Sequence, residues 1–232
     1  KIQEFQNLKG KKITKVDGSE GKCNIEFLVH PSIFTHHLKK PFELGTGAYG
    51  TVVGFMSKTN EFAGVAIKMF LSPLRAEKTA QRCFRELQLL RSLNHENIVR
   101  WKFAYTTESK HDPYAIYLVT EYAGPDLREW LRLETEKKHF FSLNSFKEMI
   151  FELLRAIEYL SSQNILHRDV KPSNLAINIA GKLTLLDFGM ARVFETRGQE
   201  VTSDSGTCVY RAIETIIIWD EGERGLISYD DK

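Results

Sequence analysis

Cysteine and long apolar runs are scarce in this sequence. The three cysteines among 232 residues, Cys23, Cys83 and Cys208, form no C-x-x-C pair of the kind that binds zinc or supports redox chemistry. An odd number of widely spaced cysteines fits a reducing compartment better than a disulfide framework. No apolar stretch approaches the roughly 18 to 20 residues of a membrane span, and the first residues lack the apolar core of a signal peptide. We therefore expect a cytoplasmic or nuclear protein.

The sequence also lacks a large excess of charge of either sign. Thirty-two lysines and arginines stand against 30 aspartates and glutamates, which gives a formal net charge of +2. This small excess gives no reason to expect nucleic acid or a membrane surface as a partner. With 42% hydrophobic and 27% charged residues, the composition is that of an ordinary globular protein able to bury a core.

The first half of the sequence predicts an extension, a small sheet and one helix. Residues 1–40 contain several lysines and little apolar periodicity, so we expect an extension outside the main core. Short strands are expected at Phe42–Leu44, Thr51–Met56 and Phe62–Phe70, separated by Gly-rich or polar turns, which predicts an antiparallel sheet. Apolar residues at three- and four-residue steps predict an amphipathic helix over Ala76–Leu93.

The second half predicts a longer helix between short strands. A β-rich stretch, Tyr114–Thr120, precedes a break at Gly124–Pro125, where we place a hinge. A helix is expected over Ser145–Ser161, beginning with a Ser-x-x-Glu capping box and packed fully in a helical unit. Its residues expected to be buried are Phe146, Met149, Ile150, Leu153, Leu154, Ile157 and Leu160. Two apolar strands, Leu175–Asn178 and Leu183–Leu186, then lead into polar segments.

A glycine-rich segment follows the pattern G-x-G-x-x-G-x-V. Its residues are Gly45, Thr46, Gly47, Ala48, Tyr49, Gly50, Thr51 and Val52. Glycines allow main-chain amides to approach phosphate oxygens that any Cβ would hold away. A dinucleotide-binding turn requires a helix after the third glycine, whereas a strand is expected here, which favours a strand–turn–strand flap over phosphates. The motif alone also fits a plain glycine-rich hairpin.

Lys68 ends the segment Val65-Ala-Ile-Lys68, 18 positions after Gly50. A strand in this place could hold the ammonium group against nucleotide phosphates while its apolar neighbours pack. Glu86 follows after another 18 positions, inside the predicted helix, and could pair with Lys68. The alternative is a solvated lysine and a glutamate that belongs to a charged helix face.

The most informative polar residues lie in two nearby segments. They are His167-Arg168-Asp169-Val-Lys171-Pro-Ser-Asn174 and, 13 residues later, Asp187-Phe188-Gly189. Phosphoryl transfer requires the protein mainly to position groups and to neutralise charge. Asp169 would accept or orient the proton of a substrate hydroxyl, and Lys171 would stabilise the transferring phosphoryl group. Asn174 and Asp187 carry the hard oxygen ligands that Mg²⁺ prefers.

These motifs, in this order, resemble the signature set of the protein kinase superfamily. The resemblance implies an α+β, two-lobed protein kinase fold, with ATP and Mg²⁺ as cofactors. It places a small antiparallel β lobe with one helix over 41–122 and an incomplete, mainly helical lobe over 123–232. Lys171, two residues after Asp169, resembles the Ser/Thr class, so protein substrates with serine or threonine hydroxyls are expected.

The sequence is similar in more detail to the mitogen-activated protein kinases, especially their stress-activated branch. The segments that carry this similarity are Cys83–Val99, Thr120–Gly124, His167–Asn178 and Tyr210–Glu214. The resemblance implies nucleotide contacts for Ala66, Thr120 and Asp126. It places Thr120 at the back of the adenine pocket and Asp126 near the ribose.

The family's Thr-x-Tyr activation pair falls at Thr202-Ser-Asp204, where an aspartate replaces the tyrosine. We expect Thr202 to be a regulatory phosphosite that an upstream activating kinase modifies, with Arg168 as the partner of its phosphate. An ordinary loop threonine is the alternative. Ile213 stands where the family has proline, so a preference for proline next to the phosphoacceptor stays open.

The sequence ends 18 residues after Glu214, where the family continues into further helices. The resemblance therefore covers roughly residues 41–232, and we expect these 232 residues alone to transfer little phosphate. The alternative function is an inactive, pseudokinase-like or fragmentary module that binds nucleotide or partners without transferring phosphate.

Overall fold

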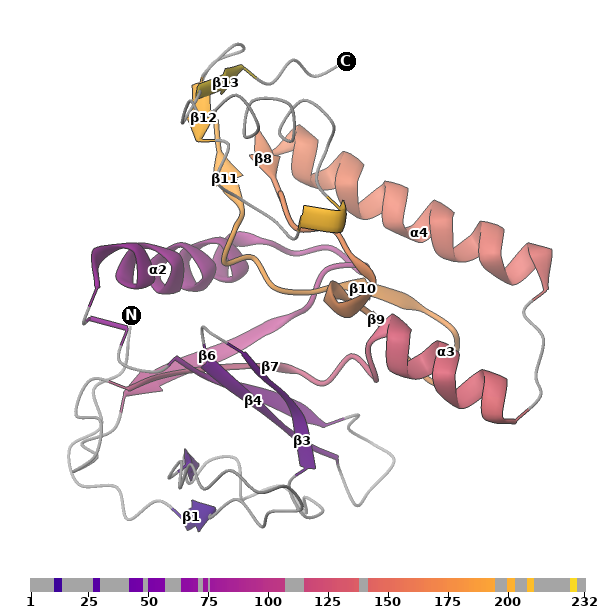
Figure 1. Ribbon diagram of the computed structural model, residues 1–232, viewed down its shortest axis with the longest axis horizontal. Helices are drawn as coiled ribbons and strands as arrows, with labels where there is room; N and C mark the ends of the chain where they lie inside the picture. The colour runs from indigo at the N-terminus through magenta and orange to yellow at the C-terminus, as the bar shows by residue number, and fades with distance from the viewer. Residues whose placement is uncertain are drawn as a thin grey trace. The chain divides into compact units, whose positions relative to one another are not determined.

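The structure is a computed structural model of the chain (Figure 1). It describes residues 11–13, 27–29, 42–47, 50–56, 64–70, 73–74, 76–106, 115–137, 142–194, 200–202, 208–210 and 226–228. The chain divides into two compact units, Lys1–Leu87 with Arg100–Tyr122, and Gln88–Val99 with Ala123–Lys232. None of the described helices is both long enough and apolar enough to span a membrane.

The first unit is built on a five-stranded antiparallel sheet. Its strands in spatial order are β3 (Phe42–Gly47), β4 (Gly50–Phe55), β5 (Val65–Phe70), β7 (Ile116–Glu121) and β6 (Trp101–Thr106). In β5, Val65, Ile67 and Met69 are buried, whereas Ala66 and Lys68 are half-buried. This alternation directs one face of the strand to the core and turns Lys68 to the other face.

Aromatic packing completes the core of the first unit. The rings of Tyr105 and Tyr117, on neighbouring strands, stack with their centroids 4.7 Å apart, and both side chains are buried. Aromatic pairs of this kind add to the stabilisation that burial alone provides. Helix α2 (Glu77–Ser92) buries Cys83 completely, and a separate antiparallel pair joins β1 (Lys11–Ile13) to β2 (Phe27–Val29). The range 1–40 therefore contains a strand pair that its sequence did not predict.

Among the described residues of the second unit are helices α3 (Leu127–Glu136) and α4 (Leu143–Ser162) and several short strand pairs (Figure 1). They also include the 3₁₀ turns η1 (Pro172–Asn174) and η2 (Cys208–Tyr210). The antiparallel pairs are β8 (Ile165–Leu166) with β11 (Arg192–Val193), β9 (Leu175–Ile177) with β10 (Leu183–Leu185), and β12 (Glu200–Thr202) with β13 (Leu226–Ser228). The hairpin formed by β9 and β10 follows directly after the polar segment that contains Asp169.

The sequence-based prediction for α4 was wrong in two respects. The helix begins at Leu143 with Ser142 as its N-cap, whose hydroxyl accepts a hydrogen bond from the Ser145 amide at 3.0 Å, so Ser145 lies inside the first turn. Of the seven residues expected to be buried, only Met149 and Leu160 are. Leu153 is half-buried, and the exposed ones are Phe146, Ile150, Leu154 and Ile157. Periodicity identified the apolar face but could not show how much of it is covered.

Several further elements were not predicted, among them helix α3, strand β6 and the short strands β8, β11, β12 and β13. Asp126 caps α3 by accepting a hydrogen bond from the Glu129 amide at 2.9 Å, and Asp-Leu-Arg-Glu is a capping-box pattern present in the sequence. The alternation of large and small residues in Trp101–Thr106 was the corresponding signal for β6.

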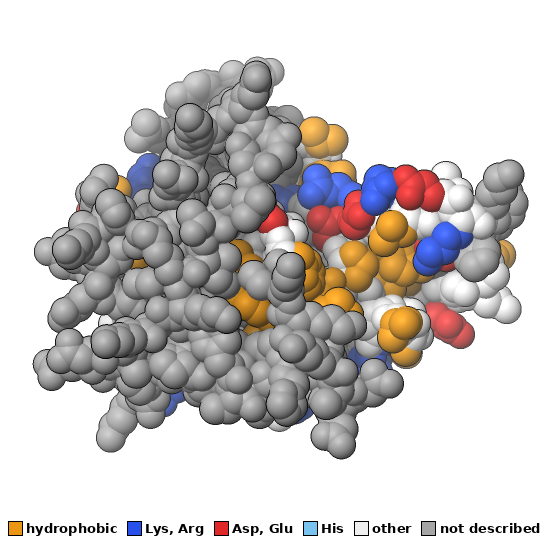
Figure 2. Space-filling model, turned by 90° about the horizontal axis from the view of Figure 1, so that it is seen from below, with side chains coloured by type: hydrophobic (Ala, Val, Ile, Leu, Met, Phe, Trp, Pro, Cys, Tyr) orange, Lys and Arg blue, Asp and Glu red, His pale blue; other side chains and the backbone are white. Residues whose placement is uncertain are grey.

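Charges of both signs are mixed on the surface of α3. Arg132 pairs with Glu129 at 2.7 Å and with Glu136, and Lys137 pairs with Glu134 at 2.9 Å. Lysine and arginine side chains also lie among acidic and hydrophobic ones on the face drawn in Figure 2. Exposed pairs such as these contribute little to stability individually. They do not form a basic patch on that helix.

Candidate active site

The glycine-rich segment is the turn between β3 and β4. A strand follows Gly50 directly, so the helix that a dinucleotide-binding turn requires is not there. Gly50 has φ +150°, and a Cβ on it would lie 2.2 Å from the carbonyl oxygen of Met69. A Cβ on Gly45 would meet nothing within 4 Å. The turn therefore needs glycine at position 50 for its own fold, whereas the space beside Gly45 is open to a ligand.

Polar side chains support this turn from both strands. The Thr46 hydroxyl donates to Glu43 at 2.7 Å and lies 3.3 Å from the Thr51 hydroxyl. Val52 pairs with Lys68 across β4 and β5. The predicted contacts of Ala48 and Tyr49 lie outside the described residues.

Lys68 and Glu86 form a close ion pair. The Lys68 ammonium donates to both carboxylate oxygens of Glu86, at 2.8 Å and 2.7 Å, and Glu86 is only 3% exposed. The ammonium also lies 5.1 Å from the centroid of the Phe70 ring. A buried carboxylate needs such a partner, because an unpaired charge in this position would be strongly destabilising. The pair fixes the ammonium on the face of β5 opposite to Val65, Ile67 and Met69.

Cys83 lies one helical turn before Glu86 and is completely buried. Burial, together with the Glu86 carboxylate, raises the pKa of the Cys83 thiol to about 12, against a smaller opposing effect of Lys68. Since the thiolate is the reactive form, this cysteine is chemically inert in the folded protein. It is not a candidate nucleophile.

The residues expected near the adenine and the ribose occupy defined positions. Ala66 and Thr120 are direct partners across β5 and β7, and Thr120 is buried. In the second unit, one carboxylate oxygen of Asp126 caps α3 and the other accepts from Arg128 at 3.2 Å. A carboxylate offers about four acceptor sites, so these two bonds leave Asp126 able to accept from a hydroxyl group.

Asp169 is held by two side chains of its own segment. Its Oδ2 lies 2.7 Å from the Lys171 ammonium and accepts from the Asn174 amide at 3.0 Å. The same Asn174 Nδ2 also donates to the Asp169 carbonyl at 2.8 Å, and both Asp169 and Asn174 are buried. The structure therefore brings together three of the polar residues that the sequence singled out. Their mutual hydrogen bonds fix the direction of the carboxylate.

His167 connects Asp169 to the segment that carries Asp187. Its Nε2 lies 2.9 Å from the Leu186 carbonyl oxygen, and its Nδ1 accepts from the Asp169 amide at 3.3 Å. These two bonds assign the proton of the neutral ring to Nε2. Burial lowers the pKa of His167, against an opposing effect of the hydrogen bond to Leu186. His167 is thus a neutral structural support, a role that its sequence position alone did not reveal.

Asp187 and Asn174, the predicted metal ligands, are linked through the main chain. The Leu186 amide donates to the Asn174 carbonyl at 2.8 Å, and Asp187 follows with φ +58°. Asp187 accepts from the Gly189 amide at 3.2 Å, and Phe188 is completely buried with its ring edge against His167. A positive φ at a non-glycine residue is uncommon and is held in place by such surroundings.

The donor set of these two residues fits Mg²⁺. Because Asn174 uses its Nδ2 for Asp169, its Oδ1 is the atom left to act as an oxygen ligand. One carboxylate and one amide oxygen suit a metal that keeps several waters and binds phosphate oxygens as well. Within the described ranges, no group of three His, Cys, Asp or Glu residues could form an all-protein metal cage.

Thr202, the predicted phosphosite, lies at the end of β12 and pairs with Leu226 of β13. Asp204 and Ile213, at which the sequence departs from the family pattern, lie outside the described residues. The structure therefore gives the backbone position of Thr202 and leaves its regulatory role as a prediction.

Comparison with known proteins agrees with this arrangement. A family model described as the protein kinase domain matches residues 38–227. Mitogen-activated protein kinase 12 of Danio rerio is 35% identical over 178 residues, which is 76% of this chain and 47% of that protein. The pmk-1 kinase of Caenorhabditis elegans, a mitogen-activated protein kinase, is 37% identical over 177 residues, 76% of this chain and 45% of the relative. Mitogen-activated protein kinase 13 of Mus musculus is 37% identical over 184 residues, which is 77% of this chain and 46% of that protein.

The chain thus spans about half the length of these relatives. The matched family range contains the glycine-rich turn, the Lys68–Glu86 pair, the Asp169 segment and Asp187. The order of these features and the family match lead to the same conclusion: the chain belongs to the protein kinase family.

Proposed function

We propose that this chain carries the ATP-binding and catalytic residues of a Ser/Thr protein kinase that transfers the γ-phosphate of ATP to protein hydroxyls. The observation that carries the proposal is the Asp169 carboxylate, buried and held by Lys171 and Asn174. A module that only binds nucleotide has no need of a carboxylate positioned in this way. The same geometry speaks against the pseudokinase-like alternative.

Each part of the site has a role in this reaction. The glycine-rich turn and Lys68 bind the phosphates, and Glu86 keeps the ammonium in place. Asn174 and Asp187 would hold Mg²⁺, which would neutralise charge on the phosphate oxygens. Asp169 orients the substrate hydroxyl and accepts its proton, and Lys171 stabilises the charge of the group in transfer.

The relatives suggest the kind of kinase. The similar proteins from Danio rerio, Caenorhabditis elegans and Mus musculus are named mitogen-activated protein kinases. We assign this chain to the same type of signalling pathway, with protein substrates, an upstream activating kinase and a cytoplasmic or nuclear location. Thr202 is the proposed site of that activation, and neither nucleic acid nor a membrane is a proposed partner.

Nucleotide binding is tested by thermal unfolding of residues 1–232 with ATP, with and without Mg²⁺. ATP should raise the melting temperature, and Mg²⁺ should increase that rise. The Asp187→Ala variant should keep the metal-independent part and lose the metal-dependent part. A folded wild-type sample that ATP does not stabilise would exclude the proposed nucleotide site.

Because residues 1–232 alone are expected to transfer little phosphate, phosphoryl transfer is tested in a chain extended at its C-terminus to a full catalytic domain, with radiolabelled ATP and a general protein substrate. Asp169→Asn keeps the size of the side chain and removes the base, so any activity above this variant belongs to the site. If ATP binds with Mg²⁺ but transfer equals the Asp169→Asn blank even after incubation with an activating kinase, the nucleotide-binding alternative is correct. Thr202→Ala, treated in the same way, tests the phosphosite.

A further inference from the structure

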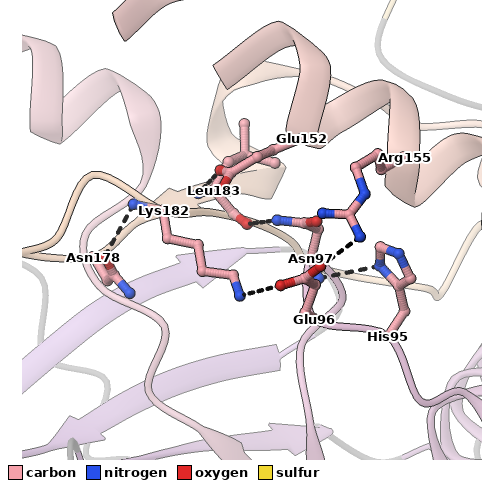
Figure 3. Close-up of polar contacts among 8 residues, drawn as sticks. All are labelled: His95, Glu96, Asn97, Glu152, Arg155, Asn178, Lys182 and Leu183. Carbon is pink, nitrogen blue, oxygen red and sulfur yellow. Dashed lines mark hydrogen bonds and ion pairs between the residues drawn. The ribbon is translucent and has the colours of Figure 1, made fainter. Parts of the chain in front are cut away.

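A cluster of polar residues outside the candidate active site joins α4, β10 and the segment after α2 (Figure 3). The Glu96 carboxylate pairs with Arg155 of α4 at 2.6 Å and with Lys182 at 2.8 Å. Asn97 has no part in the proposed reaction, yet its side chain is completely buried. The cluster lies within the second unit.

One residue of β10, Leu183, is held in this cluster through both of its main-chain polar groups. Its main-chain N–H donates to the Glu152 carboxylate at 2.6 Å, and its carbonyl accepts from the Asn97 Nδ2 at 2.9 Å. Glu152 reaches Leu183 from α4, 31 residues earlier in the chain (Figure 3). A carboxylate that accepts from a buried amide makes a charge-assisted bond, which is stronger than a neutral one.

Further main-chain bonds fix the rest of β10. The Leu185 amide donates to the Asn97 carbonyl at 2.8 Å, and the Val99 amide donates to the Leu185 carbonyl at 3.0 Å. On its other edge β10 pairs with β9, with Leu183 opposite Ile177. The strand has little freedom to shift along its axis, because both of its edges are hydrogen-bonded.

Burying the polar side chain of Asn97 costs desolvation energy that an apolar residue in the same position would not require. Among the described residues, the buried Oδ1 of Asn97 has no hydrogen-bond partner. An apolar residue at this position would leave no acceptor unsatisfied. What Asn97 adds is the specific bond from Nδ2 to Leu183.

The strand leads directly to both predicted metal ligands. Leu186, which follows β10, donates its amide to the Asn174 carbonyl, and Asp187 is the next residue. Asp187 is four residues from Leu183 and has a positive φ. Because a non-glycine residue keeps this conformation only when its surroundings hold it, the position of Asp187 depends on the main chain that precedes it. A shift of β10 would therefore move Asp187 and disturb the bond to Asn174.

We propose that Glu152 and Asn97 are positioning residues for the magnesium ligands. By fixing Leu183, they hold β10 so that Asp187 and Asn174 present their oxygens together. This inference rests on the proposed function, because it assumes that these two residues bind Mg²⁺ with ATP. Residues that support metal ligands without touching the metal commonly change its affinity by about 10- to 100-fold when they are removed.

The test measures ATP affinity with Mg²⁺ and with EDTA in the wild-type chain and in Glu152→Ala. The ratio of the two affinities isolates the contribution of the metal. We expect Glu152→Ala to reduce this ratio by about 10-fold and to leave metal-free ATP affinity within about twofold of wild type. Asn97→Ala should act in the same direction. Glu152→Gln keeps an oxygen acceptor for the Leu183 amide and should recover most of the ratio.

Glu158→Ala is the matched control, an exposed glutamate of the same helix whose removal should leave the ratio unchanged. Melting temperatures confirm that each variant is folded; if Glu152→Ala is not, Glu152→Asp, one methylene shorter, replaces it with the same expectation. An unchanged ratio in a folded variant, or an equal loss with and without metal, would overturn the positioning role. If the wild-type chain itself binds ATP without any effect of Mg²⁺, the proposed metal site fails instead, and this inference with it.

Discussion

The Lys68 ammonium donates hydrogen bonds to both carboxylate oxygens of Glu86, a residue 18 positions later in the sequence. Removal of Glu86 alone leaves a half-buried cation without its main counter-charge, and removal of Lys68 alone leaves a buried carboxylate. Breaking a buried pair in this way costs about 3–5 kcal/mol, a value to be reduced here because Lys68 is partly exposed.

We therefore expect Glu86→Leu and Lys68→Met each to lower the free energy of unfolding by about 2–3 kcal/mol. The double variant should regain most of that loss, because two apolar residues of similar volume replace the pair. Urea unfolding of the four proteins measures the cycle. Additive losses in the double variant would show that the two side chains are not energetically coupled. ATP binding should be weak in every variant that lacks Lys68.

The two glycines of the β3–β4 turn should respond differently to substitution. In Gly50→Ala, the new Cβ meets the Met69 carbonyl on a backbone with φ +150°, and we expect a loss of more than about 1 kcal/mol in unfolding free energy. In Gly45→Ala, the Cβ enters open space, so stability should change by less than about 0.5 kcal/mol. Urea unfolding distinguishes the two. ATP affinity should fall in Gly45→Ala if phosphates occupy that space, and an unchanged affinity would place them elsewhere.

His167 makes stability depend on pH in a defined direction. Its pKa is lowered in the folded protein, chiefly by burial, so the unfolded chain binds more protons just below the ordinary histidine pKa of about 6.5. The stabilisation is complete above that pH and is lost as the pH falls through the lowered pKa. Each pH unit within this window costs up to about 1.4 kcal/mol for one group.

Urea unfolding at pH 7.5, 6.5 and 5.5 measures this dependence. The His167→Gln variant should be less stable at pH 7.5 but should lose less stability between pH 6.5 and 5.5 than the wild-type chain. Equal losses in both proteins would show that other groups cause the pH dependence. Direct titration of the His167 ring by NMR provides an independent check of the direction.

The outer face of α4 should make the chain prone to association. Phe151 is 63% exposed and Leu154 is 56% exposed, within an apolar face that extends from Leu143 to Ile157. Contiguous apolar patches of this kind are uncommon on monomeric proteins. We expect the double variant Phe151→Ser, Leu154→Ser to associate less and to bind less of a dye that recognises apolar surface. Its free energy of unfolding should change by less than about 1 kcal/mol. Light scattering after size-exclusion chromatography measures the association, and Ala156→Ser, at a buried position of the same helix, is the destabilising control.

Local patterns in the sequence predicted the parts of the site that depend on neighbours in the chain. The segment from His167 to Asn174 was recognised together because its residues match the kinase signature, and the structure shows that Asp169, Lys171 and Asn174 are also each other's hydrogen-bond or ion-pair partners. Periodicity placed Lys68 on a strand and Glu86 on a helix, and the known requirements of phosphoryl transfer then suggested that the two residues pair. Glu152 was not, because its partner is a main-chain amide 31 residues away and any charged helix residue looks alike in sequence. Sequence periodicity in α4 likewise could not distinguish a covered apolar face from an exposed one.

The buried thiol of Cys83 makes the chain a reporter of its own unfolding. A thiol whose pKa is about 12 reacts with an alkylating reagent only after the helix around it opens, and it lies one turn from Glu86. With Cys23 and Cys208 replaced by serine, the labelling rate at this single site would measure how often α2 opens. If ATP slows that labelling, bound nucleotide and the order of the helix are thermodynamically linked. Such linkage could be followed without any phosphate transfer.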